Sequence, residues 1–134
     1  MCQYGRSGES TTLAQLLNGG YVSGPEKMAR QVLVVLTSLG NEADARALVT
    51  ALVEDRLIAC GTLLSGARSI YRWEGRVHDE SEVVVLLKTD VAHWDALRAA
   101  VERRHPYEVP ELLALPVEHG LERYLTWLTG EVAG

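Results

Sequence analysis

Two stretches of the chain are almost continuously apolar. Residues 31–39 read QVLVVLTSL, and residues 82–89 read EVVVLLKT. Runs of this length that are rich in valine and leucine predict strands covered on both faces. Residues 112–118 predict a short strand at a sheet edge or bulge, because Pro116 cannot donate a ladder hydrogen bond.

A third extended segment lies between the two long runs. Residues 60–73 are interrupted at 65–66, and polar and apolar side chains alternate near their end, which predicts a half-buried strand. A hairpin tip is predicted at 74–75, because the glycine there supplies the positive φ of a tight turn. A turn at 79–81 is the alternative.

Apolar residues recur at helical spacing in three further places. Asn41 is placed to cap a helix, with Glu42 and Asp44 in its electropositive first turn. Asp90 caps a second helix, which ends before Pro106 because the preceding residue is pushed out of the helical region. The apolar stripes are Ala45, Leu48, Val49, Leu52 and Leu57 in the first helix, Trp94, Leu97 and Val101 in the second, and Leu121, Tyr124, Leu125 and Leu128 in a terminal helix closed by Gly130.

The order of these elements is βαββαβ followed by one more helix. Two split βαβ halves predict an α+β fold: a ferredoxin-like sandwich with an antiparallel sheet and both main helices on one face. The consecutive apolar positions of the central strands require a cover on the other face as well. One short extra helix is too small for that, so we expect partner chains to cover it.

The first 27 residues differ from the rest of the chain. They are rich in Gly, Ser and Thr, and we interpret them as a leader or extension that contains at most a short helix at 11–18. The folded domain is predicted to span residues 28–134. We expect the domain to fold and assemble without this leader.

Composition and charge argue against several classes of function. The apolar fraction of 47% and charged fraction of 23% are those of an ordinary globular domain. The net charge of −5 argues against nucleic acid as the main partner. Neither a membrane-spanning run nor a secretory signal is evident, so we expect a cytoplasmic protein without a membrane partner.

Four stretches together resemble the divalent-cation tolerance family (CutA). They are EDRLIACGTL at 54–63, SIYRWEGRV at 69–77, EVVVLLKT at 82–89 and HPYEVPELLALPVEHGLERYLTWL at 105–128. The combination of Y-x-W-x-G, a later E-x-x-x-x-x-K-T and the H-P-Y-E-x-P-E loop is highly specific. The resemblance implies a ferredoxin-like domain assembled as a homotrimer, with a role in tolerance of divalent metals.

The resemblance also implies a metal ligand, because copper binding is reported for some members of the family. Their copper pattern uses a cysteine at the end of the first strand and two adjacent histidines before Pro-Tyr. The matching positions here are Leu36, Arg104 and His105, so two of the three ligands are absent. No obligatory cofactor is expected, and copper or another divalent metal is the ligand to test.

His105 is the best single metal candidate from the residues themselves, with Glu108 beside it. One imidazole does not make a site of three or four ligands. The favoured interpretation is therefore a helix-end residue whose ring hydrogen-bonds the last carbonyls.

Five residues are predicted to lie at a subunit interface or in a ligand cleft. Tyr and Trp are typical of subunit interfaces, and a lysine within an apolar strand must reach a carboxylate or solvent, with Glu82, Glu108 and Glu111 as candidates on the same or a neighbouring chain. The five residues are Tyr71, Trp73, Lys88, Tyr107 and Glu111.

Enzymatic activity is not expected. No nucleophile elbow, phosphate-binding loop, dinucleotide fingerprint or C-x-x-C pair occurs. A hydrolase built from Cys60, His105 and Glu108 is a minor alternative, because Cys60 is better interpreted as a small buried residue. The leading hypothesis is a homotrimer that binds copper or zinc weakly. The alternative is a trimeric small-molecule sensor of the PII type, with ligand clefts between subunits.

Overall fold

A computed structural model describes residues 31–132 of the 134-residue chain. The elements follow the predicted order, βαββαβ plus a last helix. They are β1 (Val32–Leu39), α3 (Glu42–Glu54), β2 (Cys60–Trp73), β3 (Arg76–Asp90), a 3₁₀ turn (Val91–His93), α4 (Trp94–Arg104), β4 (Leu113–Pro116) and α5 (Glu122–Glu131). The predicted leader at 1–27, with its short helix at 11–18, lies outside the described residues.

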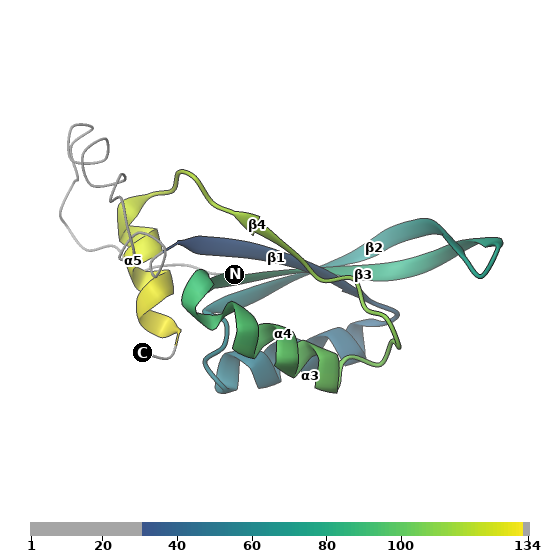
Figure 1. The fold of residues 1–134 in the computed structure, drawn as a ribbon, viewed down its shortest axis with the longest axis horizontal. Helices are drawn as coiled ribbons and strands as arrows, with labels where there is room; N and C mark the ends of the chain where they lie inside the picture. Colours follow the sequence, from purple (N-terminus) through teal and green to yellow (C-terminus); the bar gives the residue numbers. More distant parts are fainter. Residues whose placement is uncertain (1–30, 133–134) are drawn as a thin grey trace.

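The four strands form one antiparallel sheet in the order β2-β3-β1-β4 (Figure 1). This confirms the predicted α+β fold with an antiparallel sheet. β4 is an edge strand of four residues that ends at Pro116, as a proline that cannot donate to a ladder requires.

The helices α3 and α4 lie side by side on one face of the sheet (Figure 1). Alternate residues of β1 and β3, among them Val35 and Leu87, point into this layer and are fully buried. They pack against the inner faces of the helices, represented by Leu52 and Leu97. This helix-covered core is the part of the fold that a single chain completes.

The predicted caps at Asn41 and Asp90 and the predicted end of α4 are confirmed. The Asn41 side-chain oxygen accepts a hydrogen bond from the Asp44 amide at 2.8 Å and starts α3. The Asp90 side chain caps the 3₁₀ turn that leads into α4 and accepts from the His93 amide at 3.1 Å. α4 ends at Arg104, directly before the residue that precedes the proline.

Two helix predictions are wrong in detail. Leu57 packs on the core from the turn after α3, because the helix already ends at Glu54. Gly130 lies inside α5, which continues to Glu131. There Arg56 donates to the carbonyl oxygens of Gly130 and Glu131 at 3.2 and 3.0 Å and satisfies the end of the helix.

The strand β2 spans the predicted residues 60–73, whereas β3 begins six residues earlier than the predicted strand at 82–89. β3 has 15 residues and begins at Arg76, and the hairpin runs well past the end of β1 (Figure 1). Its tip is at Glu74 and Gly75, with φ angles of 50° and 77°, so the predicted tip is confirmed and the alternative turn at 79–81 is wrong. The predicted interruption is a bulge between Leu64 and Ala67.

Within residues 31–132, the second face of the sheet is covered at one end only. Directly paired residues share a face, so Leu113, Leu36 and Leu86 form an apolar row across three strands. Helix α5 packs over the start of β1 through Leu128 and Val132. We call the remaining surface the open face. Its edges are strongly exposed: Leu64 at 49%, Leu113 at 54% and Leu115 at 50%.

Candidate functional site

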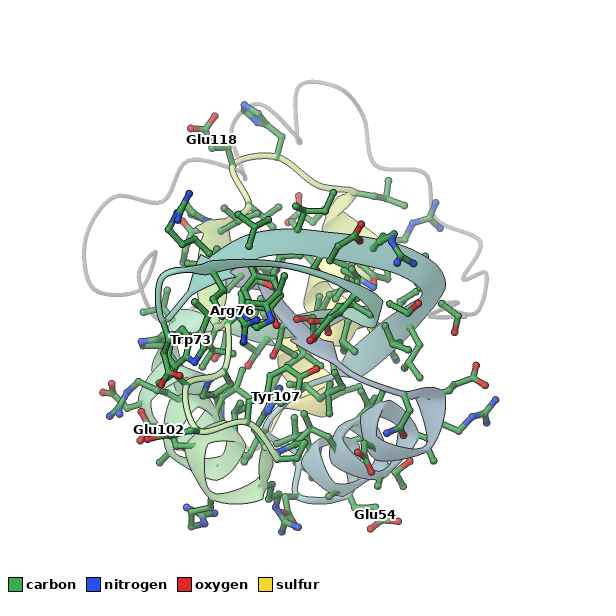
Figure 2. The ribbon with its side chains drawn as sticks, turned by 90° about the vertical axis from the view of Figure 1, so that its right-hand side faces the viewer. Glu54, Trp73, Arg76, Glu102, Tyr107 and Glu118 are labelled. Atoms are coloured by element: carbon green, nitrogen blue, oxygen red, sulfur yellow. The ribbon has the colours of Figure 1, made fainter. Side chains whose placement is uncertain are left out.

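A cleft of about 580 Å³ opens where the hairpin passes the loop at 105–112 that joins α4 to β4. Figure 2 views the molecule from the hairpin end: Trp73 and Arg76 lie at the tip, and Tyr107 lies between the hairpin and the helices. The loop starts where Pro106 stops α4, so the sequence motif itself sets its position. We call this surface the acidic cleft.

The lining of the acidic cleft combines carboxylates with aromatic rings. No lysine, arginine or histidine is among the lining residues that the structure describes. The lining consists of Glu80, Glu82, Glu108 and Glu111, the rings of Tyr71, Trp73 and Tyr107, and the smaller contributions of Ser38, Ser69, Ile70 and Val109.

Glu82 is the most buried carboxylate of the cleft, with 6% of its surface exposed. Its Oε2 accepts a hydrogen bond from the Tyr107 hydroxyl at 3.1 Å. Burial, the Glu82 charge and this hydrogen bond together raise the pKa of Tyr107 to about 12. The tyrosine therefore stays protonated at neutral pH and acts as a donor to the carboxylate.

A second tyrosine–glutamate pair lies nearer the hairpin tip. The Tyr71 hydroxyl donates to Glu80 Oε2 at 3.0 Å, and this bond, followed by burial and the nearby charges, raises the pKa of Tyr71. The Tyr71 ring stacks on His78 with centroids 5.2 Å apart. Tyr71 and Trp73 are 38% and 45% exposed, which is more than the predicted half-buried strand implies, because nothing in the described chain covers this part of the hairpin.

His105 is buried and both of its ring nitrogens contact the backbone. Nε2 lies 2.8 Å from the Ser38 carbonyl oxygen, to which it donates, and Nδ1 accepts from the Tyr107 amide at 3.1 Å. The ring joins the loop to β1, rather than to the last carbonyls of α4 as expected. This arrangement uses both nitrogens and leaves no lone pair for a metal.

The other two positions of the copper pattern hold no ligand. Leu36 lies on the open face of the sheet. Arg104 donates to the Asp55 carboxylate at 3.3 Å. No group of three or more His, Cys, Asp or Glu side chains suited to a metal occurs in the described range 31–132.

Lys88 lies far from the acidic cleft. It is opposite Cys60 and Val34, and its ammonium group donates to the Thr62 hydroxyl at 3.3 Å. Lys88 lies six positions beyond Glu82 along β3, a span of about 20 Å. Burial lowers the pKa of Lys88. The predicted pairing with Glu82 is therefore not formed within one chain.

The structure thus brings together Tyr71, Trp73, Tyr107, Glu108 and Glu111, places His105 behind the cleft and leaves Lys88 elsewhere. Sequence reasoning missed Glu80 as a lining residue and treated Glu82 only as a partner for Lys88. The signal was present. With the hairpin tip at 74–75, Tyr71 pairs with His78. Glu80 and Glu82 follow at alternate positions of β3, so both lie on the same face of the hairpin as Tyr71.

The three residues of the hydrolase alternative, Cys60, His105 and Glu108, do not come together. The Cys60 sulfur contacts the Tyr124 hydroxyl and the Lys88 ammonium group, each at 3.8 Å. Cys60 lies across β3 from Val34, near the start of β1. The His105 ring hydrogen-bonds the Ser38 carbonyl, near the end of β1.

Comparison with known proteins decides the family. A family profile described as "CutA1 divalent ion tolerance protein" matches residues 33–131. The chain belongs to the CutA divalent-cation tolerance family. A CutA protein of Pectobacterium atrosepticum is 47% identical over 100 residues, which cover 75% of this chain and 91% of that protein. The corresponding protein of Citrobacter koseri is 45% identical over 102 residues, covering 76% and 89%.

Solved CutA structures share the fold. The divalent cation tolerance protein of Thermus thermophilus matches with a TM-score of 0.74 at 41% identity, covering 76% of this chain and 99% of that one. CutA1 of Oryza sativa matches with a TM-score of 0.75 at 33% identity, covering 77% and 94%. CutA membership makes this chain a tolerance protein and not an enzyme. No helix of the described part of the chain is long and apolar enough to span a membrane; the cytoplasmic location stays a prediction.

Proposed function

We propose that this CutA chain assembles as a homotrimer and serves divalent-cation tolerance by binding cations such as copper or zinc weakly in the acidic cleft. The observation that carries the proposal is the set of four glutamates around one cleft with no basic side chain in its described lining. In residues 31–132 these glutamates do not form a ready-made group of three or more metal ligands, but Glu108 and Glu111 are exposed, so their side chains can move to an entering cation at little cost.

Weak binding follows from the chemistry of the donors. Copper and zinc favour imidazole and thiolate ligands, and carboxylate oxygens alone hold them less tightly. The described lining provides oxygen donors from glutamates, tyrosines and serines. His105 supports the site indirectly, because its bonds to Ser38 and Tyr107 fix the loop that presents Glu108.

Assembly is supported by the open face. In the described part of the chain, an apolar row runs across β4, β1 and β3 with strongly exposed leucines at its edges. Contiguous exposed apolar surface of this kind is typical of subunit interfaces. Light scattering at micromolar concentration should give three times the 14.7 kDa chain mass. A stable monomer would contradict this part of the proposal.

Calorimetric titration with zinc and copper salts tests the metal part. We expect weak saturable binding of the metal to the wild-type chain. A Glu108→Gln, Glu111→Gln double variant should bind the metal more weakly than the wild type. Glu54→Gln is the matched control, because Glu54 points to solvent from α3, away from the cleft (Figure 2). Equal binding by the double variant and the control would place the metal elsewhere.

The second candidate is a small-molecule sensor with clefts between subunits. The observation that favours it is the aromatic wall of the cleft, because stacking rings are typical of sites for organic ligands. A thermal-shift screen with metals and with nucleotides separates the two candidates, since a ligand that prefers the native state raises the melting temperature.

A further inference from the structure

The buried charge of Glu82 requires a compensating group. Its carboxylate is nine-tenths buried and accepts one hydrogen bond, from Tyr107. Within residues 31–132 no basic side chain comes within ion-pair distance of it. Buried carboxylates are stable when a cation or several donors neutralise them. A cation that enters the cleft would neutralise this carboxylate.

The walls of the cleft favour a cation with an organic part. Three aromatic rings, Tyr71, Trp73 and Tyr107, line the same space as the carboxylates. The face of an aromatic ring attracts an ammonium or guanidinium group within about 6 Å, and the attraction strengthens where water is excluded. Ile70 and Val109 add apolar surface for an alkyl stem.

The volume of the cleft also favours an organic cation over a bare metal ion. At about 580 Å³ it lies within the roughly 300–1,000 Å³ range of small-molecule sites. A bare metal ion would use the carboxylates and leave the aromatic and aliphatic walls without a role.

We propose that the acidic cleft binds a small organic cation, a primary ammonium group on a short apolar stem, with Glu82 as its buried countercharge. The ammonium group takes the Glu82 oxygen that Tyr107 does not occupy, and the stem lies against Trp73 and Ile70. This inference shares with the proposed function only the assumption that the cleft is a ligand site.

The test is calorimetric titration of the full chain with n-butylammonium chloride. Butan-1-ol, which has the same stem without the charge, is the control for apolar binding. Zinc chloride is titrated separately. We expect saturable binding of the ammonium ion and none of the alcohol at the same concentrations.

Two substitutions locate the site. Glu82→Gln keeps the shape and the acceptor for Tyr107 but removes the charge, and it should weaken n-butylammonium binding by about tenfold or more. Glu111→Gln lies on the exposed rim, does not endanger the fold and should weaken binding by about two- to threefold. Glu54→Gln carries the same change of net charge on α3 and should bind like the wild type.

The outcomes separate this inference from the proposed function. Zinc binding without ammonium binding overturns this inference and supports the metal proposal. Ammonium binding without zinc binding supports this inference and contradicts the metal proposal. Equal binding of the alcohol, or equal affinity of all three variants, overturns it as well. If the ammonium ion does not bind and Glu82→Gln dissociates the assembly, the inference is overturned and the countercharge comes from a basic side chain of a second copy.

Discussion

The two halves of the β2–β3 hairpin differ in what surrounds them. The half that pairs with β1 carries Val85 and Leu87, both fully buried beneath α3 and α4. The distal half, 67–73 with 76–82, pairs only with itself and exposes Ile70 at 69% and Val77 at 65%. A lone two-stranded ribbon is marginal in water. The described part of the chain therefore completes one half, whereas the other half keeps its apolar side chains exposed.

The largest expected effect comes from Trp73→Ala, which tests the distal half. If the ring is buried where chains meet, the substitution costs about 3–5 kcal/mol at each of three equivalent sites. Sedimentation velocity over a dilution series should show dissociation that depends on concentration. Trp94→Ala is the control, because Trp94 packs against the helix-covered core and its loss should damage each chain. An assembly of Trp73→Ala that persists at nanomolar concentration with an unchanged melting temperature would make Trp73 a ligand-stacking residue only.

A matched pair of leucines sharpens the same comparison. Leu97→Ala removes a fully buried side chain from α4 and should lower the free energy of unfolding by about 2–5 kcal/mol. Leu113→Ala, on the open face, should change the unfolding of a single chain little and weaken assembly instead. Urea denaturation at two protein concentrations distinguishes the two. A similar loss in both variants at every concentration would show that one chain buries the open face itself.

Tyr107→Phe tests the bond between the loop and the distal half. Removing the hydroxyl leaves the buried Glu82 carboxylate without its donor, which should cost about 1–3 kcal/mol.

The same variant has a distinct pH dependence. The folded pKa of Tyr107, about 12, lies above the usual 10.0, so the unfolded chain loses this proton first as the pH rises. The associated stability is fully present below pH 10 and is lost between about pH 10 and 12. The difference in melting temperature between wild type and Tyr107→Phe should therefore shrink over that range, and a constant difference would contradict the pairing.

The smallest expected effect is at the hairpin tip. Glu74 has a φ of 50°, a conformation that asparagine tolerates better, and Asn-Gly is a favoured two-residue hairpin turn. Glu74→Asn should stabilise the chain by less than about 1 kcal/mol, measured by thermal melting. Arg72→Asn, within the extended strand, is the control and should not stabilise. A melting temperature that falls in Glu74→Asn would show that the glutamate has a role beyond the turn.

The sequence by itself determined the elements, their order and the turn at the hairpin tip. These depend on neighbours in the chain: the helical spacing of Ala45, Leu48 and Leu52, the cap at Asn41 and the glycine at 75 act within a few residues. The motifs at 69–77 and 105–128 also identified the family.

Only the tertiary structure decided which side chains meet at the cleft. Glu82 lies 25 residues from Tyr107, and His105 lies 67 residues from Ser38, so no local pattern relates them. The first part of β3 was equally hidden, because residues 76–81 have no buried face to mark them in the sequence. Burial of Glu82 was also decided by the fold, and a carboxylate that water would solvate needs a partner once the fold removes it from solvent.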